Sequence, residues 1–147
     1  KLSIYLYKLM KKKIKKKILV DMSAAIIHNG HVRLIKKASK FGNVIIALTT
    51  DKEIKKHKKL IPELNYKLRK EILLEFKKVS KVIPCNFEIT QNFLTKHKID
   101  AIVQGSDYSK RKFKCKTITY NRTKNISSSI IRNIAAKNIK NIFKRKK

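Results

Sequence analysis

Short continuous apolar runs alternate along this chain with segments whose apolar residues have helical spacing. The runs at residues 18–20, 43–49 and 99–103 lack the polar alternation of a half-exposed strand, and two further strands are expected at 81–84 and 116–120. Parallel strands that are buried on both faces have this pattern. The order predicts an α/β fold, a Rossmann-like open parallel sheet of about five strands with helices on both faces.

The segments between these runs predict helices. Gly42 fits a C-cap of the first helix, and Thr50 with Asp51 fits the start of a short helix. Longer helices are expected at residues 30–40 and 66–78 and another short one at 91–97, and a last helix opens with three serines at 127–129.

The helix expected at residues 66–78 has a clear apolar stripe. Asn65 is a good N-cap for it, and Arg69 falls off the stripe. The residues that the spacing assigns to the core are Leu68, Ile72, Leu73 and Phe76.

Length and composition bound the domain organisation. A chain of 147 residues with 42% hydrophobic residues is long enough for one domain with its own core. We expect that domain at residues 17–137, between a basic lead-in at 1–16 and a basic tail at 138–147. Met10 fits a natural start, so residues 1–9 need not be native. The lead-in is interpreted as irregular, with a weak amphipathic membrane-contact segment as the alternative.

Several observations bear on where the protein works. No apolar run approaches the roughly 18 residues of a membrane span, and no signal peptide is recognisable. The two cysteines, Cys85 and Cys115, form neither a CxxC motif nor a disulfide framework. These features predict a reducing, cytoplasmic setting.

The formal net charge is +30, from 39 Lys and Arg against 9 Asp and Glu. Such a charge attracts phosphorylated ligands, and it is also typical of proteins that bind nucleic acids. However, the basic residues are spread along the whole chain without a pattern of stacking aromatic residues, and Lys, Ile and Asn are all abundant. We therefore favour compositional bias over a nucleic-acid partner.

The corner between the first strand and the first helix carries the most specific chemistry. His28, Asn29, Gly30 and His31 directly precede the helical pattern there. A strand that turns into a helix points backbone N–H groups and the positive end of the helix dipole at one spot, which suits a phosphate. Two imidazoles lie beside that spot. An HxGH motif alone is weak evidence, because a histidine at a helix start is often only a capping residue.

Three later segments carry further candidate groups. Residues 55–59 are a basic patch after the second strand, residues 104–107 form a Gln-Gly-Ser-Asp turn, and residues 122–129 read RTKNISSS. Ligands bind at the carboxyl ends of strands in open α/β sheets, and serines at a helix start offer hydroxyl and N–H groups to an anion. Each segment also has a plain structural interpretation, as a solvated charge run, a turn carboxylate or an N-cap.

In this order the motifs resemble those of the cytidylyltransferase-like nucleotidyltransferases, over about residues 18–132. That family has a G-x-F-D-like turn followed by HxGH, then a Lys and an Arg, a G-[DS]-D turn and an R-T-E-G-I-S-T-[ST] motif. The chain is most similar to the glycerol-3-phosphate and choline-phosphate cytidylyltransferases. The resemblance implies an enzyme that transfers the cytidylyl group of CTP to a small phosphorylated alcohol and releases pyrophosphate. It also implies Mg²⁺ on the triphosphate and a homodimer.

The resemblance implies roles for individual residues. The catalytic residues would be His28, His31, Lys58 and Arg122. The histidines would act on the triphosphate and its transition state, Arg122 on the β- and γ-phosphates, and Lys58 on the phosphate of the acceptor. The nucleotide would be bound by Ser23, Gly30, Arg69, Gly105, Asp107, Thr123, Ile126, Ser127 and Ser128. No protein ligand of a metal is expected.

The chain departs from the family pattern in both main motifs. In the first turn Ala25 replaces Asp and Met22 replaces Gly, and strand alternation does not obviously bring Asp21 to the same place. In the last motif Lys124 and Asn125 replace Glu and Gly, although Asn tolerates a positive φ. The alternatives are therefore a catalytically weakened homologue that acts as a basic nucleotide- or nucleic-acid-binding protein, and an adenylyltransferase that uses ATP.

Overall fold

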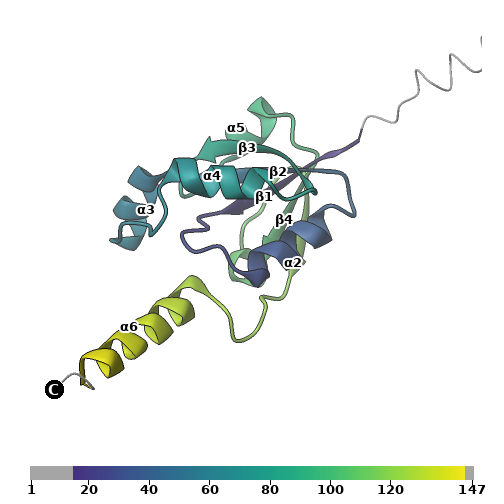
Figure 1. The fold of residues 1–147 in the computed structure, drawn as a ribbon. Coiled ribbons are helices and arrows are strands. Elements are labelled where there is room, and N and C mark those ends of the chain that lie inside the picture. The colour runs from purple at the N-terminus through teal and green to yellow at the C-terminus, as the bar shows by residue number, and fades with distance from the viewer. Residues whose placement is uncertain (1–14, 145–147) are drawn as a thin grey trace, which may run out of the picture.

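Five parallel strands form one open sheet in the order β3-β2-β1-β4-β5 (Figure 1). The structure, a computed structural model, describes residues 15–144, so most of the expected lead-in and the last three residues lie outside it. The strands are β1 (Lys17–Met22), β2 (Asn43–Thr49), β3 (Val79–Cys85), β4 (Ala101–Gly105) and β5 (Lys116–Tyr120). The predicted α/β fold with a five-stranded parallel sheet is thus confirmed.

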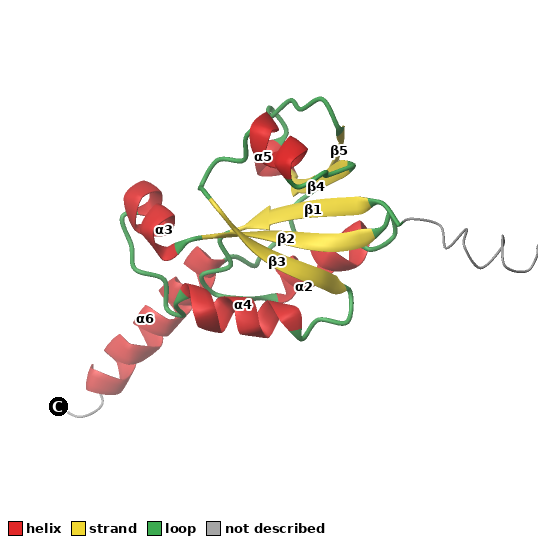
Figure 2. Ribbon diagram, turned by 90° about the horizontal axis from the view of Figure 1, so that it is seen from above, coloured by secondary structure: helices red, strands yellow, loops and turns green. Residues whose placement is uncertain are grey.

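Helices cover both faces of the sheet (Figure 2). Helices α2 and α4 pack on one face and α5 packs on the other. Their bounds are α2 (Asn29–Ala38), α3 (Asp51–Lys58), α4 (Tyr66–Leu74), α5 (Gln91–Lys96) and α6 (Ser128–Lys144), with a short 3-10 helix at Ser106–Tyr108. Because β1 is covered on both sides, Ile18, Leu19 and Val20 are all fully buried, which explains its continuous apolar run.

Two helix ends differ from the prediction. Helix α2 ends at Ala38 with Ser39 as its C-cap, so Gly42 does not cap it. A Cβ atom at Gly42 would collide with the backbone carbonyl of Lys16, and glycine is needed there for close approach instead. Helix α4 stops at Leu74, four residues before the predicted end.

The predicted core face of α4 is confirmed only in part: Leu73 is buried as expected and Phe76, just beyond the helix, packs against the core, but Leu68 and Ile72 are not buried. Leu68 and Ile72 are 43% and 39% exposed, whereas Arg69 and Leu73 are fully buried. Arg69 finds polar partners beneath the helix, and these partners rotate α4 away from the orientation that its apolar residues favour. Tertiary hydrogen bonds have overridden the local pattern here.

Helix α6 extends away from the sheet in both views (Figures 1 and 2). It continues to Lys144 without a break at the expected domain boundary near residue 138, and none of its residues is buried. Within residues 15–144, no helix is long and apolar enough to cross a membrane. Cys85 and Cys115 are both free thiols.

The strand order places a switch point beside β1. The chain adds β2 and β3 on one side of β1, and then β4 and β5 on the other side. Ligands of open α/β sheets bind outside the carboxyl ends of the strands at such a point. The fold therefore directs attention to the residues that follow β1 and β4.

Candidate active site

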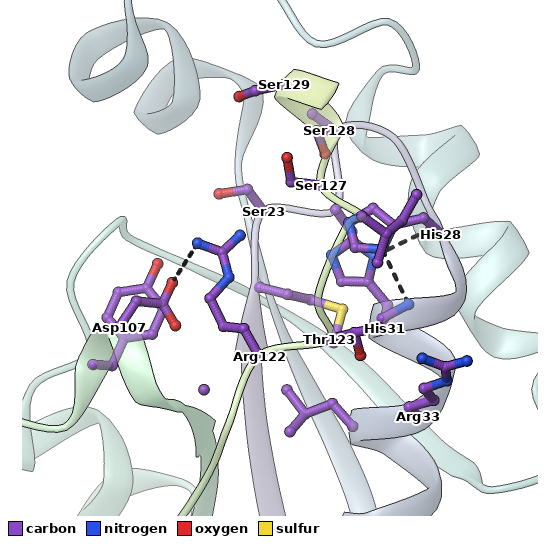
Figure 3. Close-up of a pocket in the computed structure, with 18 of the residues that line it drawn as sticks. Ser23, His28, His31, Arg33, Asp107, Arg122, Thr123, Ser127, Ser128 and Ser129 are labelled. Carbon is purple, nitrogen blue, oxygen red and sulfur yellow. Dashed lines mark hydrogen bonds and ion pairs between the residues drawn. The ribbon is translucent and has the colours of Figure 1, made fainter. Parts of the chain in front are cut away.

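A cavity of about 520 Å³ lies at the carboxyl ends of β1, β4 and β5 (Figure 3). Its walls also include α2, the last residue of α3 and the start of α6. The cavity has the size of a small-molecule site. It brings together all but one of the residues that the sequence suggested: His28, His31, Lys58, Arg122, Ser23, Gly30, Gly105, Asp107, Thr123, Ile126, Ser127 and Ser128.

The two histidines form a reciprocal cap at the start of α2. The Gly30 N–H donates to His28 Nδ1 at 3.1 Å, and the His28 N–H donates to His31 Nδ1 at 3.2 Å. Both Nδ1 atoms are therefore acceptors, and the proton of each neutral ring lies on Nε2. A Cβ atom at Gly30 would lie 2.9 Å from His28 Nδ1, so glycine allows the ring to fold back over the helix.

Both imidazoles are held in the neutral state. Burial, and next the charge of Arg122, lowers the pKa of His28. Burial, and next His28 itself, lowers the pKa of His31 to about 4. The ring centroids are 4.0 Å apart, so one charged ring would repel a charge on the other. At neutral pH the pair presents two N–H donors without a positive charge.

The lowered pKa of His31 predicts a loss of stability in acid. The unfolded chain takes up the proton near pH 6.5, whereas folded His31 resists it down to about pH 4. The stability that results from this lowered pKa is therefore fully present above pH 6.5 and is lost as the pH falls. The free energy of unfolding should be lower by about 2 kcal/mol at pH 5 than at pH 7. We expect urea unfolding at pH 7 and pH 5 to show this loss in the wild type, but not in His31→Gln, which keeps an acceptor for the His28 N–H. An equal loss of stability in the wild type and in His31→Gln would show that the lowered pKa of His31 is not its cause.

Arg122 and Lys58 line the same cavity as the histidines. Arg122 Nη1 lies 3.6 Å from Asp107 Oδ2 (Figure 3). Burial, followed by the charges of Arg132 and Arg122, lowers the pKa of Lys58. A group of this kind attracts an anion of high charge, such as a chain of phosphates.

The serine segment forms the start of α6. The Ile130 N–H donates to Ser127 Oγ at 3.1 Å, and Ser128 Oγ donates to the Ile26 carbonyl at 3.3 Å. Asn125 has a φ of 59°, so the turn before the helix keeps the conformation that the family's glycine suggests. Ser127 caps the helix while Ser128 joins it to the loop after β1, and both line the cavity.

Arg69 is the expected site residue that lies outside the cavity. Its side chain is fully buried. It donates to the carbonyls of Leu64, Ser23 and Thr49 and to Asp51, whose carboxylate is 2.6 Å away. With its donors used inside the protein, Arg69 is placed to hold the loop after β1 and not to contact a nucleotide.

Other lining residues were missed by the motif comparison. Arg33 and Lys37 share one face of α2, and Lys37 Nζ lies 4.3 Å from the centre of the Tyr120 ring. Both residues follow Gly30 at helical spacing, and this spacing could have identified them from the sequence as residues on the same face of the helix. Asp21 also lines the cavity, but Arg111 holds its carboxylate at 2.9 and 3.2 Å.

The donor set does not form a metal site by itself. Residues 15–144 contain no cluster of three or more His, Cys, Asp or Glu side chains that could hold a metal ion. The carboxylates in the lining, Asp21 and Asp107, are each paired with an arginine. Ala25, where the resemblance leads one to expect Asp, is buried in the same wall. The cavity therefore does not fit a cation held by protein ligands alone.

Comparison with known proteins identifies relatives along most of the chain. A profile of the family described as cytidylyltransferase-like matches residues 23–134. The glycerol-3-phosphate cytidylyltransferase of Bacillus subtilis is 31% identical over 80% of this chain and 95% of its own length. Proteins of the same name from Bacillus spizizenii and Staphylococcus aureus are 34% and 31% identical, again over 80% of this chain and over 95% and 92% of theirs.

Solved structures share the fold at lower identity. A lipopolysaccharide core biosynthesis protein from Thermoplasma volcanium has a TM-score of 0.62 and 18% identity, covering 74% of this chain and 98% of that one. A putative nicotinate-nucleotide adenylyltransferase from Vibrio parahaemolyticus has a TM-score of 0.51 and 20% identity, covering 80% and 85%. At these identities the likeness shows a common fold alone.

Proposed function

Because the chain belongs to the cytidylyltransferase-like family and is a nucleotidyltransferase, we propose that it transfers the cytidylyl group of CTP to a small phosphorylated alcohol. Glycerol 3-phosphate is the first candidate acceptor, since three relatives at 31–34% identity are named for it. Phosphocholine and phosphoethanolamine are the next candidates. A homodimer and a cytoplasmic location remain predictions.

The observation that supports this proposal best is the pair of neutral imidazoles at the cavity wall. His28 and His31 each keep an Nε2–H donor, and the cations Lys58 and Arg122 line the same cavity. Donors fixed by the backbone need no reorganisation when charge develops on a phosphoryl group. This arrangement suits a reaction whose transition state carries more negative charge at one phosphorus than the ground state.

The proposed reaction needs no strong general base. A phosphate oxygen of the acceptor is already anionic at neutral pH, and it forms a bond to the α-phosphorus of CTP. The bond from that phosphorus to the oxygen bridging to the β-phosphate breaks, and pyrophosphate leaves. Positioning and charge stabilisation then supply the rate increase, which agrees with a cavity rich in His, Arg and Lys and poor in free carboxylates.

Individual residues have distinct roles in this proposal. His28 and His31 donate to the phosphates at the reacting centre, Arg122 and the start of α6 hold the pyrophosphate portion, and Lys58 holds the acceptor phosphate. Cytidylyltransferases generally use a divalent metal cation. We propose Mg²⁺ in that role, bound through oxygens of the triphosphate.

The proposal predicts pyrophosphate release by the purified protein with Mg²⁺, CTP and glycerol 3-phosphate. Parallel reactions with ATP, phosphocholine and phosphoethanolamine define the nucleotide and the acceptor. Release of pyrophosphate with ATP alone would support nucleotidyl transfer but overturn the choice of CTP as the substrate. No release from a folded protein that still binds CTP would favour a catalytically weakened homologue, with Ala25 as the first residue to change.

A further inference from the structure

Arg132 lies one turn into α6 and lines the cavity, although no motif pointed to it. Helical residues four apart lie on the same face, and their side chains lean toward the N-terminus of the helix. Arg132 therefore shares a face with Ser128 in the first turn of the helix, and both residues line the cavity. That turn offers hydroxyl groups, free N–H groups and the positive end of the helix dipole.

Glu63 holds the guanidinium of Arg132 in a forked pair. Both Nε and Nη2 donate to the carboxylate, and the distance from Nη2 to Oε2 is 2.7 Å. The hydrogen bond to Arg132 lowers the pKa of Glu63, so the carboxylate stays charged at neutral pH. The fork occupies one edge of the guanidinium. Within residues 15–144, Nη1 has no hydrogen-bond partner and is available to a ligand.

The pair joins two parts of the chain that border the cavity. Glu63 lies in the segment between α3 and α4, whose Leu60 lines the cavity, while Arg132 belongs to α6. The side chains of Arg132 and Glu63 are 28% and 42% exposed, and an ion pair this exposed contributes little to stability. The forked pair with Glu63 is therefore better explained as orienting the guanidinium of Arg132 than as stabilising the fold.

The electrostatics place Arg132 beside the other cations of the cavity. Among the charges that lower the pKa of Lys58, Arg132 has the largest effect and Arg122 the next. Three cations thus meet at the α6 side of the cavity. An anion with several charges would relieve their mutual repulsion.

We propose that Arg132 binds the β- or γ-phosphate of the nucleotide and that Glu63 positions it for this contact, an inference that rests on the proposed function of the same cavity. The guanidinium can donate to a phosphate from its second edge while the first edge stays on Glu63. Arg132 would then add a phosphate contact to those of Arg122 and the serine segment.

Calorimetric titration of Arg132→Met with CTP, CMP and inorganic tripolyphosphate tests the contact. We expect the Kd of CTP and of tripolyphosphate to rise about 10- to 100-fold, as for a lost hydrogen bond to a charged group. The Kd of CMP should change by less than about twofold, because CMP lacks the outer phosphates. Lys140→Met removes one charge from α6 outside the cavity lining and should leave all three values unchanged.

An equal loss of CTP and CMP affinity in Arg132→Met would assign Arg132 a structural role and overturn the inference, as would an unchanged Kd for CTP. Binding of tripolyphosphate separates a failure of the proposed cytidylyltransferase function from a failure of the proposed phosphate contact of Arg132. If the wild type binds it but neither binds nor turns over CTP or ATP, the proposed function fails, and the inference is then judged on tripolyphosphate alone. If Arg132→Met does not fold, Arg132→Lys replaces it, with an intermediate loss expected because lysine keeps the charge without the fork.

The positioning role of Glu63 is tested by Glu63→Gln. We expect a severalfold weaker affinity for CTP, and no further loss when the change is added to Arg132→Met, since both remove the same contact. Fully additive losses, or a tighter affinity in Glu63→Gln, would overturn the positioning role.

Discussion

Alanine in place of His31 is expected to lower kcat for pyrophosphate release by about two orders of magnitude or more, the usual effect of removing one preorganised donor from a transition state. The Nδ1 atom of His31 is fixed by the backbone N–H of His28, so the ring lines the cavity in a defined tautomer with Nε2–H as its donor. His28→Ala should have a similar effect, because its Nδ1 is fixed by the N–H of Gly30.

The kinetic signature distinguishes this role from simple binding. A donor that acts mainly in the transition state lowers kcat and leaves KM for CTP nearly unchanged. His97→Ala is the matched control, because His97 lies outside the residues that line the cavity. Normal kcat in His31→Ala, or a loss that appears only in KM, would remove His31 from the catalytic residues.

The lowered pKa values of the histidines sharpen this expectation. Burial keeps both rings neutral, so they act as N–H donors and not as cations. His31→Gln retains a polar amide and should recover part of the rate that His31→Ala loses. Rescue by an added cation instead, as in His31→Lys, would indicate that the site needs a charge at this position.

The strands and the central corner could be predicted because both depend on local sequence. The residues of β1 are buried on two faces, and so Ile18, Leu19 and Val20 had to be apolar in succession. The histidine cap spans four residues, and its chemistry is therefore visible in the sequence. Asn125 could also be anticipated, since a positive φ favours Gly or Asn at that position.

The environment of Arg69 could not be predicted in the same way. The residues Leu68, Ile72, Leu73 and Phe76 define an apolar stripe at helical spacing, but periodicity does not reveal which polar partners lie beneath the helix. Those partners, Ser23, Thr49 and Asp51, come from segments 18–46 residues away and meet only in the folded sheet. The ion pairs of Arg132 and Asp21 could not be predicted for the same reason, because their partners Glu63 and Arg111 are 69 and 90 residues away.

Replacement of Arg69 by methionine is expected to destabilise the fold by about 3 kcal/mol or more in urea unfolding. Methionine fills part of the volume but leaves the carbonyls of Ser23, Thr49 and Leu64 without their donor. Asp51, whose side chain is 40% exposed, stays accessible to water, so the carbonyls left without a donor account for most of the loss. Lys67→Met, an exposed change on the same helix, should cost less than about 0.5 kcal/mol.

The same substitution should also alter the cavity, through the loop after β1. Arg69 holds the Ser23 carbonyl, and Ala24 next to it has a φ of 46°, which is strained for a residue other than glycine. Without the arginine, this loop should relax and weaken CTP binding indirectly. Arg69→Lys can restore a hydrogen bond to one carbonyl, and it should lie between the wild type and Arg69→Met in both stability and CTP affinity.

Stability and affinity together separate the two possible roles of Arg69. If Arg69 contacted the nucleotide phosphates, as the resemblance implied, Arg69→Met would lose CTP affinity while the urea midpoint stayed near that of the wild type. The buried side chain predicts the opposite, a large fall in the midpoint accompanied by similar losses of affinity for CTP and CMP, because a displaced loop does not discriminate between outer phosphates. A selective loss of CTP binding at wild-type stability would show that the side chain leaves its buried position when the nucleotide binds.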